Sequence, residues 1–273
     1  MLQEGSVTMI DLSNNGRRFN GMAELYDRSR PAVPIYPVRI LCRYLGRKPE
    51  RVVDLGCGPG ISTRIWQGNC EEAIGIEPNE DMVRTASEKA GPGLRFIRAF
   101  GHDTGLEEES ADIIVSSQAF HWMEPEATLA EIHRILKKGG IFSTIDYEWP
   151  PECGWKTELA FQRFSSAMSA LDPEGAKKGI VRWNKKDHLK HIRESGYFIY
   201  TRELFFASEE SCTAGRLVDM ALSRSSMQYI VGRFPEESQR LIEKFRSDLE
   251  ELVGTQTFEI QLSYRMRMGV KGE

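Results

Sequence analysis

The hydrophobic positions between residues 46 and 148 follow two alternating patterns. Short apolar runs predict five buried strands, at residues 51–55, 73–77, 94–99, 111–116 and 141–147. Amphipathic stretches between them predict helices from about residue 60, at 79–89 and at 125–137, the last ended by Gly139 and Gly140. Strands that alternate with helices are typical of a parallel sheet with right-handed crossovers. We therefore expect a doubly wound α/β core.

The segments on either side of this core predict further elements. Residues 1–16 are expected to be disordered, and residues 17–45 predict helices at 17–30 and 38–45. Residues 149–184 interrupt the alternation and predict a helical cap insertion. Residues 185–273 predict a helix to residue 195, a strand near 197–206, two helices within 211–254 and a last strand at 257–268. We expect residues 17–273 to form a single α/β domain with a Rossmann-like, mostly parallel seven-stranded sheet whose last strand is antiparallel.

Composition narrows the possible partners. The net charge of −4 and a sequence pI near 5.9 give no overall positive field, so neither nucleic acid nor a membrane surface is an expected partner. No apolar stretch resembles a signal peptide or a membrane span, and five scattered cysteines fit reduced thiols, so we expect a cytoplasmic protein. His188 and His191 stand at helical spacing among lysines and are interpreted as a solvated face, and no metal site is expected.

Three glycines mark the first candidate site. Gly56, Gly58 and Gly60 follow the predicted strand at 51–55 and precede a predicted helix, so the chain can turn sharply and a ligand can approach the backbone. Asp54 ends this strand and Glu77 ends the next one, 23 residues later, where a carboxylate can accept hydrogen bonds from ribose hydroxyls. The pattern predicts a site for a nucleotide-containing cofactor.

Nicotinamide and flavin enzymes bind dinucleotides in the same crevice, through the spacing GxGxxG. Here the spacing is GxGxG, and Ile61 stands where the third glycine of a dinucleotide loop would be. An NAD-dependent oxidoreductase is therefore the less favoured alternative.

The loop and several later segments resemble the class I S-adenosylmethionine-dependent methyltransferases, specifically the methyltransferase type 11 domain. The resemblance rests on Asp-Leu-Gly-Cys-Gly-Pro-Gly at 54–60, Gly-Ile-Glu-Pro-Asn at 75–79, Ala-Asp-Ile-Ile-Val at 111–115, Gln-Ala-Phe-His-Trp at 118–122 and the segment 131–140. It covers roughly residues 17–150. It implies S-adenosylmethionine as cofactor, S-adenosylhomocysteine as its product, and methyl transfer as the reaction.

The resemblance also implies roles for individual residues in cofactor binding. The loop from Asp54 to Gly60, including Cys57, would touch the methionine part, and Glu77, followed by Pro78, would hold the ribose. Met82 would pack on adenine. Where much of the family has an acidic residue that binds adenine, this chain has Phe100, so we expect Phe100 to stack on the ring, the Gly101 amide to donate to it and His102 to cover its edge. Gln118 would face the amino group or the sulfonium of the methionine part.

The substrate side is less defined. His121 is the candidate general base, with a structural role as its alternative, and Trp122 is expected to line the pocket. Tyr26 and Arg30 are candidates for a lid formed by residues 17–45, because in relatives a similar segment closes over the cofactor. Tyr147 and Trp149 are further candidates for residues of the substrate site or the lid.

The segment Arg-Ser-Arg-Pro-Ala-Val at 28–33 is similar to that of the trans-aconitate methyltransferase group, which esterifies a small carboxylate. Arg30 is suited to grip a carboxylate through two parallel hydrogen bonds, although a surface arginine is the alternative. We therefore expect methyl transfer to a small molecule, with a carboxylate or other oxygen as acceptor. A cofactor-binding module without catalysis is the second hypothesis, and the oligomeric state is not predicted.

Overall fold

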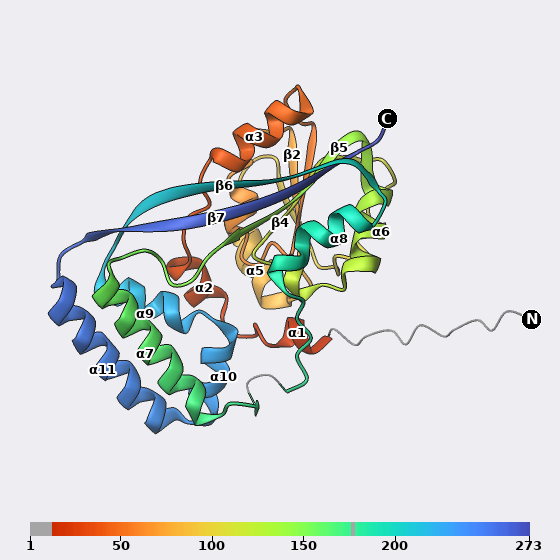
Figure 1. The fold of residues 1–273 in the computed structure, drawn as a ribbon. Helices are drawn as coiled ribbons and strands as arrows, with labels where there is room; N and C mark the ends of the chain where they lie inside the picture. The colour runs from red at the N-terminus through yellow and green to blue at the C-terminus, as the bar shows by residue number, and fades with distance from the viewer. Residues whose placement is uncertain (1–12, 176–177) are drawn as a thin grey trace, which may run out of the picture.

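The computed structural model describes residues 13–175 and 178–273 and contains one seven-stranded sheet (Figure 1). The strand order is β3-β2-β1-β4-β5-β7-β6. The neighbouring pairs among β1 to β5 are parallel, whereas β7 is antiparallel to both β5 and β6. The strands are β1 (Arg51–Leu55), β2 (Glu72–Ile76), β3 (Leu94–Ile97), β4 (Ala111–Ser117), β5 (Leu136–Tyr147), β6 (Phe198–Cys212) and β7 (Phe258–Lys271). The predicted fold class is confirmed.

Helices cover both faces of the parallel part of the sheet, which explains why its strands are apolar throughout. On one face, α3 (Tyr36–Leu45) inserts Leu41 against Val52 and Ile113. On the other face, α6 (Pro125–Ile135) and α8 (His188–Glu194) pack against the alternate positions of the same strands, such as Val53. Two short helices, α4 (Ile61–Arg64) and α5 (Glu80–Glu88), follow β1 and β2.

The junction between α6 and β5 differs from the prediction. We expected the helix to continue to residue 137 and stop at the two glycines, but it ends at Ile135 and β5 begins at once, opposite Ala111. The ammonium group of Lys271 donates to the carbonyls of His133 and Leu136 at 2.8 and 2.7 Å, which satisfies carbonyls at the helix end. Sheet pairing at residue 136 and this cap, both distant in sequence, decide where the helix stops.

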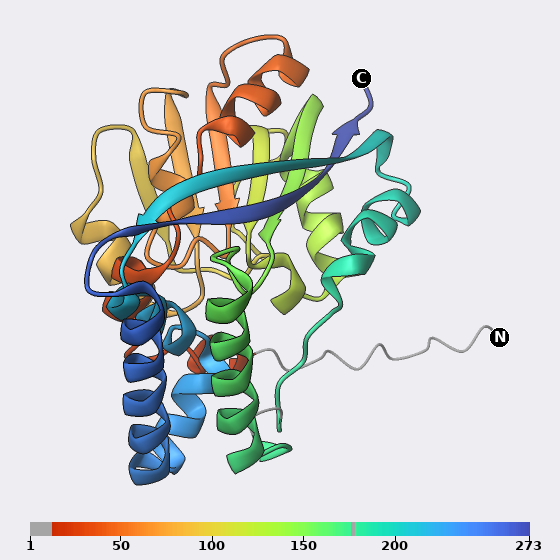
Figure 2. The ribbon, with the colours of Figure 1, turned by 60° about the vertical axis from the view of Figure 1, so that its left-hand side comes forward.

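Four helices form a separate layer below the sheet, here called the helical cap (Figure 2). They are α7 (Trp155–Leu171), α9 (Ala214–Leu222), α10 (Ser225–Arg233) and α11 (Pro235–Val253), and they share one hydrophobic core. Residues 211–254 thus hold three helices where two were predicted, because the chain breaks at Ser223 and again before Pro235. Among the residues that the structure describes, no helix is both long and apolar enough to span a membrane.

The N-terminal segment folds over the carboxyl ends of the strands as two helices, α1 (Ser13–Arg17) and α2 (Ala23–Ser29). We predicted one helix at 17–30, but Gly21 adopts a φ of 71° and interrupts it. Residues 13–16, expected to be disordered, lie in α1 because the Asn15 side chain donates to the carbonyls of Trp122 and Val181. The rest of that expected disorder, residues 1–12, lies outside the described residues.

Candidate active site

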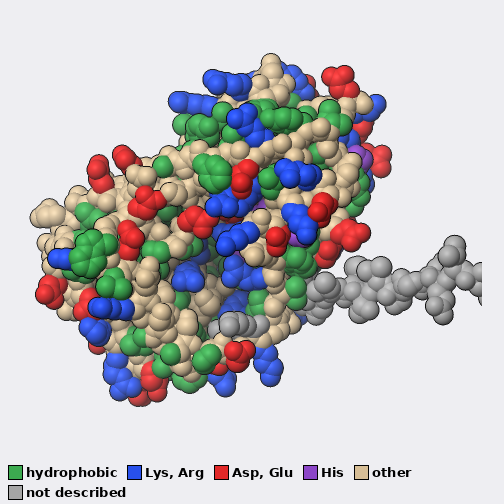
Figure 3. Space-filling model, in the orientation of Figure 1, with side chains coloured by type: hydrophobic (Ala, Val, Ile, Leu, Met, Phe, Trp, Pro, Cys, Tyr) green, Lys and Arg blue, Asp and Glu red, His purple; other side chains and the backbone are tan. Residues whose placement is uncertain are grey.

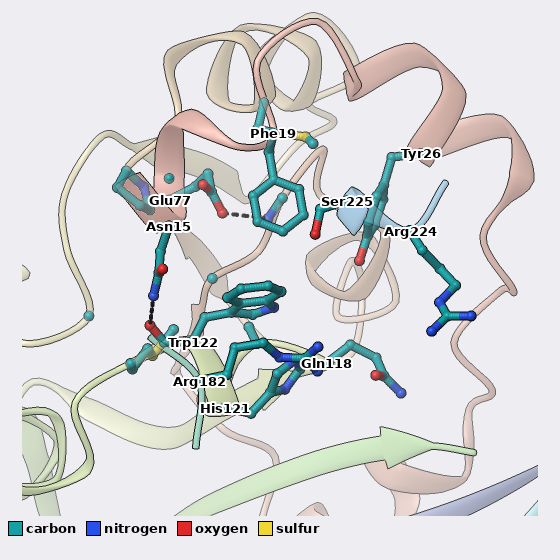
Figure 4. A pocket seen from close by; sticks show the side chains of 18 of the residues that line it. Asn15, Phe19, Tyr26, Glu77, Gln118, His121, Trp122, Arg182, Arg224 and Ser225 are labelled. Atoms are coloured by element: carbon teal, nitrogen blue, oxygen red, sulfur yellow. Dashed lines mark hydrogen bonds between the residues drawn. The ribbon is translucent and has the colours of Figure 1, made fainter. Parts of the chain in front are cut away.

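A cavity opens at the carboxyl ends of β1, β2 and β4, bounded by the N-terminal segment and by residues of the helical cap (Figure 4). Most of the residues singled out from the sequence line it, whereas four of them do not. Those that line it are Tyr26, Arg30, Gly56, Gly58, Glu77, Pro78, Met82, Phe100, Gly101, His102, Gln118, His121, Trp122 and Trp149. Those that do not are Asp54, Cys57, Gly60 and Tyr147.

The glycines of the loop after β1 serve different purposes. Gly58 has a φ of 53°, and a Cβ atom built there would meet no described atom within 4 Å, so its backbone is open to the cavity. A Cβ on Gly56 would lie 2.4 Å from that of Ala119, and one on Gly60 would lie 2.9 Å from the Phe96 ring. Gly56 and Gly60 are therefore required for packing within the protein, and Gly58 gives access to the backbone.

Asp54 lies beneath this loop, and Cys57 is a buried residue within it. The Asp54 carboxylate is fully buried and accepts hydrogen bonds from the hydroxyls of Ser62 and Thr63, at 2.6 and 2.8 Å, which ties the first turn of α4 to the end of β1. Burial raises the pKa of Asp54 to about 6. We expected both residues to touch the cofactor, but neither lines the cavity, and Asp54 supports the loop instead.

Glu77 follows β2 directly and faces the cavity. Its carboxylate accepts hydrogen bonds from the backbone amides of Gly58, at 3.1 Å, and Asn79, at 3.0 Å. Because it is only 8% exposed, burial raises its pKa to about 7 in spite of these two bonds. A buried carboxylate with unused lone pairs, beside an open glycine backbone, is suited to accept hydrogen bonds from a pair of ribose hydroxyls.

The cavity continues past Glu77 between Pro78 and Met82 and the loop after β3. The ring centres of Phe100 and His102 are 5.4 Å apart and stacked, and Phe100 is 38% exposed. Met82, which also lines the cavity, is buried. This end offers flat apolar contacts to a planar ring, without a carboxylate at position 100.

Gln118 follows β4 and adopts a φ of 54°, which is strained for a residue with a side chain. Its amide nitrogen donates to the carbonyl of Tyr147 at 3.1 Å, and its oxygen accepts a hydrogen bond from Lys185. The Lys185 ammonium also pairs with Asp146 at 3.2 Å, and burial lowers the pKa of Lys185. The polar groups of Gln118 thus already have partners in the protein.

The histidines near this point differ from expectation. His188, interpreted as part of a solvated face, is fully buried, and its Nδ1 lies 3.1 Å from the carboxylate of Asp146. The same carboxylate accepts a hydrogen bond from Arg267 at 2.9 Å. The lysines near His188 in the sequence suggested an exposed position. Its partner in the folded protein, the carboxylate of Asp146, lies 42 residues earlier in the chain.

His121 lines the cavity and is 4% exposed. Its Nδ1 is buried without a hydrogen-bond partner among the described residues. Burial, together with the charge of Lys185, holds the pKa of His121 well below its usual range. The imidazole is therefore neutral near pH 7, and its buried Nδ1 has no partner among the described residues.

Arg30 joins the lid to the sheet. Its guanidinium donates to the hydroxyl of Tyr147 at 2.8 Å and to the carbonyl of Ser223 at 3.0 Å. The guanidinium carbon lies 4.3 Å from the ring centre of Tyr26 and 5.4 Å from that of Trp149. Tyr147 itself is buried behind Arg30, and burial raises its pKa to about 12.

Sequence reasoning missed a second group of lining residues. These are Asn15, Gly16, Phe19, Ala119, Met123, Arg182, Lys185, Arg224, Ser225 and Ser226. Ala119 and Met123 flank a segment that was already singled out, and they could have been included. The others come from the N-terminal segment and from chain that follows β5, where no motif marks them.

Comparison with known proteins agrees with this geometry. Residues 53–144 match the family model of a methyltransferase domain. A probable S-adenosylmethionine-dependent methyltransferase of Saccharomyces cerevisiae is 30% identical over 131 residues, which cover 46% of this chain and 45% of the yeast protein. A ubiquinone/menaquinone biosynthesis C-methyltransferase of Campylobacter jejuni is 33% identical over 117 residues, covering 40% and 49%. The matched part spans about half the length of these curated relatives.

Solved structures extend the likeness in fold to most of the chain. A protein of Anaeromyxobacter dehalogenans, provisionally described as a type II methyltransferase, has a TM-score of 0.66 at 19% identity and covers 88% of this chain and 97% of its own. The YcgJ protein of Bacillus subtilis has a TM-score of 0.53 at 17% identity, covering 88% and 100%. Residues 53–144 are thus similar to a methyltransferase domain, and the whole chain has the fold of solved proteins of this kind.

Proposed function

We propose that the protein transfers the methyl group of S-adenosylmethionine to a small molecule, at a carboxylate or another oxygen. The arrangement of Glu77 beside the open backbone of Gly58, at the floor of the cavity, carries this proposal. It supplies hydrogen-bond acceptors for a ribose and a surface that lets the rest of the cofactor lie against the loop. Beyond it the cavity continues toward Arg30 and the helical cap, which leaves room for an acceptor.

Individual residues would share the binding of the cofactor. Glu77 would accept from the ribose hydroxyls, Phe100 and His102 would contact the adenine ring, and Met82 would pack beneath it. The N-terminal segment would close over it, because the Asn79 side chain donates to the Gly16 carbonyl at 2.9 Å and keeps this segment above Glu77.

When bound, the cofactor supplies an electrophilic methyl group on a sulfonium. A carboxylate oxygen would form the new C–O bond in line with the breaking C–S bond, whose electron pair goes to sulfur. The products are a methyl ester and a neutral thioether, and no proton is released. The protein then needs to align the acceptor and exclude water, which fits a cavity closed by the lid.

An acceptor with an acidic hydroxyl would also have to lose a proton. His121 is the candidate to take it, because its imidazole lines the cavity and is neutral near pH 7, although its lowered pKa makes it a weak base. Replacing His121 by Asn would then lower kcat on hydroxyl acceptors and leave kcat on carboxylate acceptors nearly unchanged. The ratio of kcat/KM of the wild type for the two classes measures which acceptor it prefers.

The proposal is tested by calorimetric titration with S-adenosylhomocysteine, of the wild type and of Glu77→Ala, followed by assay of methyl transfer to small carboxylates and phenols. Saturable binding that falls at least about tenfold in the variant is expected, since two charge-assisted hydrogen bonds are lost. Glu126→Ala, which removes an exposed carboxylate that does not line the cavity, is the control. Absence of binding by the wild type would refute the proposal, and binding without any turnover would favour a module that lacks catalysis.

A further inference from the structure

Positively charged side chains gather on the cap side of the cavity. Arg30, Arg182, Lys185 and Arg224 line it, and Glu77 at the opposite end is the acidic lining residue. Figure 3 shows Lys and Arg side chains inside a hollow between the sheet and the cap, and Figure 4 shows Arg182 beside Trp122 and His121, with Arg224 on the side of Tyr26 and Ser225. The whole protein is acidic, with a net charge of −4, so this cluster is local.

None of the three guanidinium groups has a carboxylate as counter-charge among the described residues, and Arg30 is held by the Tyr147 hydroxyl and the Ser223 carbonyl instead. Lys185 pairs with Asp146, whereas Arg182 and Arg224 form no ion pair with a carboxylate in residues 13–175 and 178–273. Burial lowers the pKa of both arginines, and the charges of Arg30 and Arg182 lower that of Arg224 further. Arg182 lies with its guanidinium carbon 4.6 Å from the ring centre of Trp122. Arg182 is exposed and Arg224 is half-buried, so these neighbouring positive charges are open to an anion that enters from solvent.

The first turn of α10 adds to the same site. Ser225 and Ser226 line the cavity, and their backbone amides donate to no acceptor among the described residues. The residue before them, Arg224, provides no side-chain cap. The free amides and the positive end of the helix dipole therefore face the cavity where the arginines gather, and both favour an anion.

The positive charges that line the cavity can be divided between those that have a partner on the protein or the cofactor and those left for the acceptor. The carboxylate of the cofactor's methionine part can engage one of the four cations, and Asp146 already neutralises Lys185. Two positive charges then remain without a partner on the substrate side. A neutral acceptor would leave both unpaired, and a monoanion would leave one.

We propose that Arg182, Arg224 and the N-terminus of α10 form an anion site that binds a part of the acceptor remote from the methylated atom, so that the acceptor is a small molecule with at least two negative charges. The inference rests on the proposed methyl transfer. The second anionic group is a carboxylate or a phosphate monoester, since both accept two parallel bonds from a guanidinium. Methylation of one carboxylate removes one negative charge, so the monoester product binds more weakly than the substrate.

The test uses protein saturated with S-adenosylhomocysteine and calorimetric titration with succinate, phosphoglycolate and butyrate. Succinate and butyrate have the same chain length and differ by one carboxylate, whereas phosphoglycolate carries a phosphate as its second anion. We expect succinate or phosphoglycolate to bind at least about tenfold more tightly than butyrate, and Arg182→Gln and Arg224→Gln each to weaken the binding of that ligand by about ten- to a hundredfold. Arg224→Lys should restore part of the loss. Arg240→Gln, on an exposed part of α11, is the control of equal charge and should change nothing.

The affinity for S-adenosylhomocysteine separates the two proposals. It should stay within about twofold of the wild type in both glutamine variants, because their arginines are assigned to the acceptor. Dianions that bind no better than butyrate, glutamine variants that bind dianions normally, or loss of S-adenosylhomocysteine binding in these variants would each overturn the anion site. If the wild type fails to bind S-adenosylhomocysteine, the proposed function fails, and titration of the dianions into the cofactor-free protein still tests the anion site.

Discussion

Arg30 and Tyr147, which are 117 residues apart in the chain, are joined by a hydrogen bond of 2.8 Å from the guanidinium to the phenol oxygen. It connects the end of α2, in the lid, to the end of β5, in the sheet. The guanidinium is enclosed by Tyr26 and Trp149 and held also by the carbonyl of Ser223. Arg30 is thereby fixed at the meeting point of lid, sheet and cap.

Removal of the phenol oxygen in Tyr147→Phe should lower the free energy of unfolding by about 1.5–3 kcal/mol, because a buried charged donor loses its acceptor. Tyr44→Phe is a matched control, since Arg202 donates to the Tyr44 hydroxyl over the same 2.8 Å on the exposed surface. Tyr44→Phe should lower the free energy of unfolding by less than about 1 kcal/mol. Urea denaturation measures both, and equal losses would contradict the role of burial.

Gly58→Ala should block the cofactor site with little damage to the fold. The added methyl group meets no described atom within 4 Å and projects from backbone that faces the cavity. The positive φ should cost about 1–2 kcal/mol of stability. S-adenosylhomocysteine binding should fall by at least about tenfold.

Gly105→Ala is the control for this substitution. Gly105 has a φ of 67° and equally open surroundings, but it does not line the cavity. It should lose a similar amount of stability and keep normal affinity. Equal affinities in the two variants would show that the cofactor does not lie against Gly58.

The stability of the protein should depend on pH through Glu77. Its pKa is raised from 4.5 to about 7 in the folded state, so the native protein binds more protons than the unfolded chain between these values. The free energy of unfolding therefore falls as the pH rises from about 4.5 to about 7, and the loss is complete above that range. The difference in unfolding free energy between wild type and Glu77→Gln should follow this slope in urea titrations at several pH values. A constant difference would contradict the raised pKa.

Asp146→Asn should be one of the most destabilising substitutions, at about 3–5 kcal/mol, because it removes the carboxylate between Arg267, His188 and Lys185. Although burial raises it, the hydrogen bond from His188 and the charge of Lys185 hold the pKa of Asp146 below its usual range, so its contribution is lost only as the pH falls into the acid range. Asp248→Asn, which breaks an exposed pair with Lys244, should cost less than about 1 kcal/mol. Thermal and urea unfolding at neutral pH compare the two.

The parts of the structure that follow from local sequence were predicted well. The bounds of β1 are those expected, since a β-branched run ended by glycines contains the whole signal. The neighbourhood of Glu77 and the glycine loop was also predictable, because adjacent parallel strands end at the same edge of the sheet. β6 extends to Cys212, beyond the expected residue 206, since its polar outer half is stabilised by pairing with β7 rather than by its own apolar pattern.

The cap side of the cavity could not be predicted in the same way. Asn15 and Arg224 reach the cavity through the packing of α1 and α10, and neither position is marked by periodicity or by a motif. His188 is buried by a carboxylate and an arginine that come from β5 and β7. The positions of these residues depend on contacts between segments that are distant in the chain. Such contacts cannot be read from a single sequence.

The long pair formed by β6 and β7 has a consequence for how such a protein can diversify. Three of the four cap helices, α9, α10 and α11, are inserted between these two strands, whereas the glycine loop, Glu77 and Gln118 all belong to the chain before them. The part of the proposed anion site that belongs to α10 is therefore encoded in a stretch of the gene separate from the glycine loop, Glu77 and Gln118, whereas Arg182 precedes β6. Exchange of the stretch between β6 and β7 for that of a relative is a direct route to a chimaera with an altered choice of acceptor.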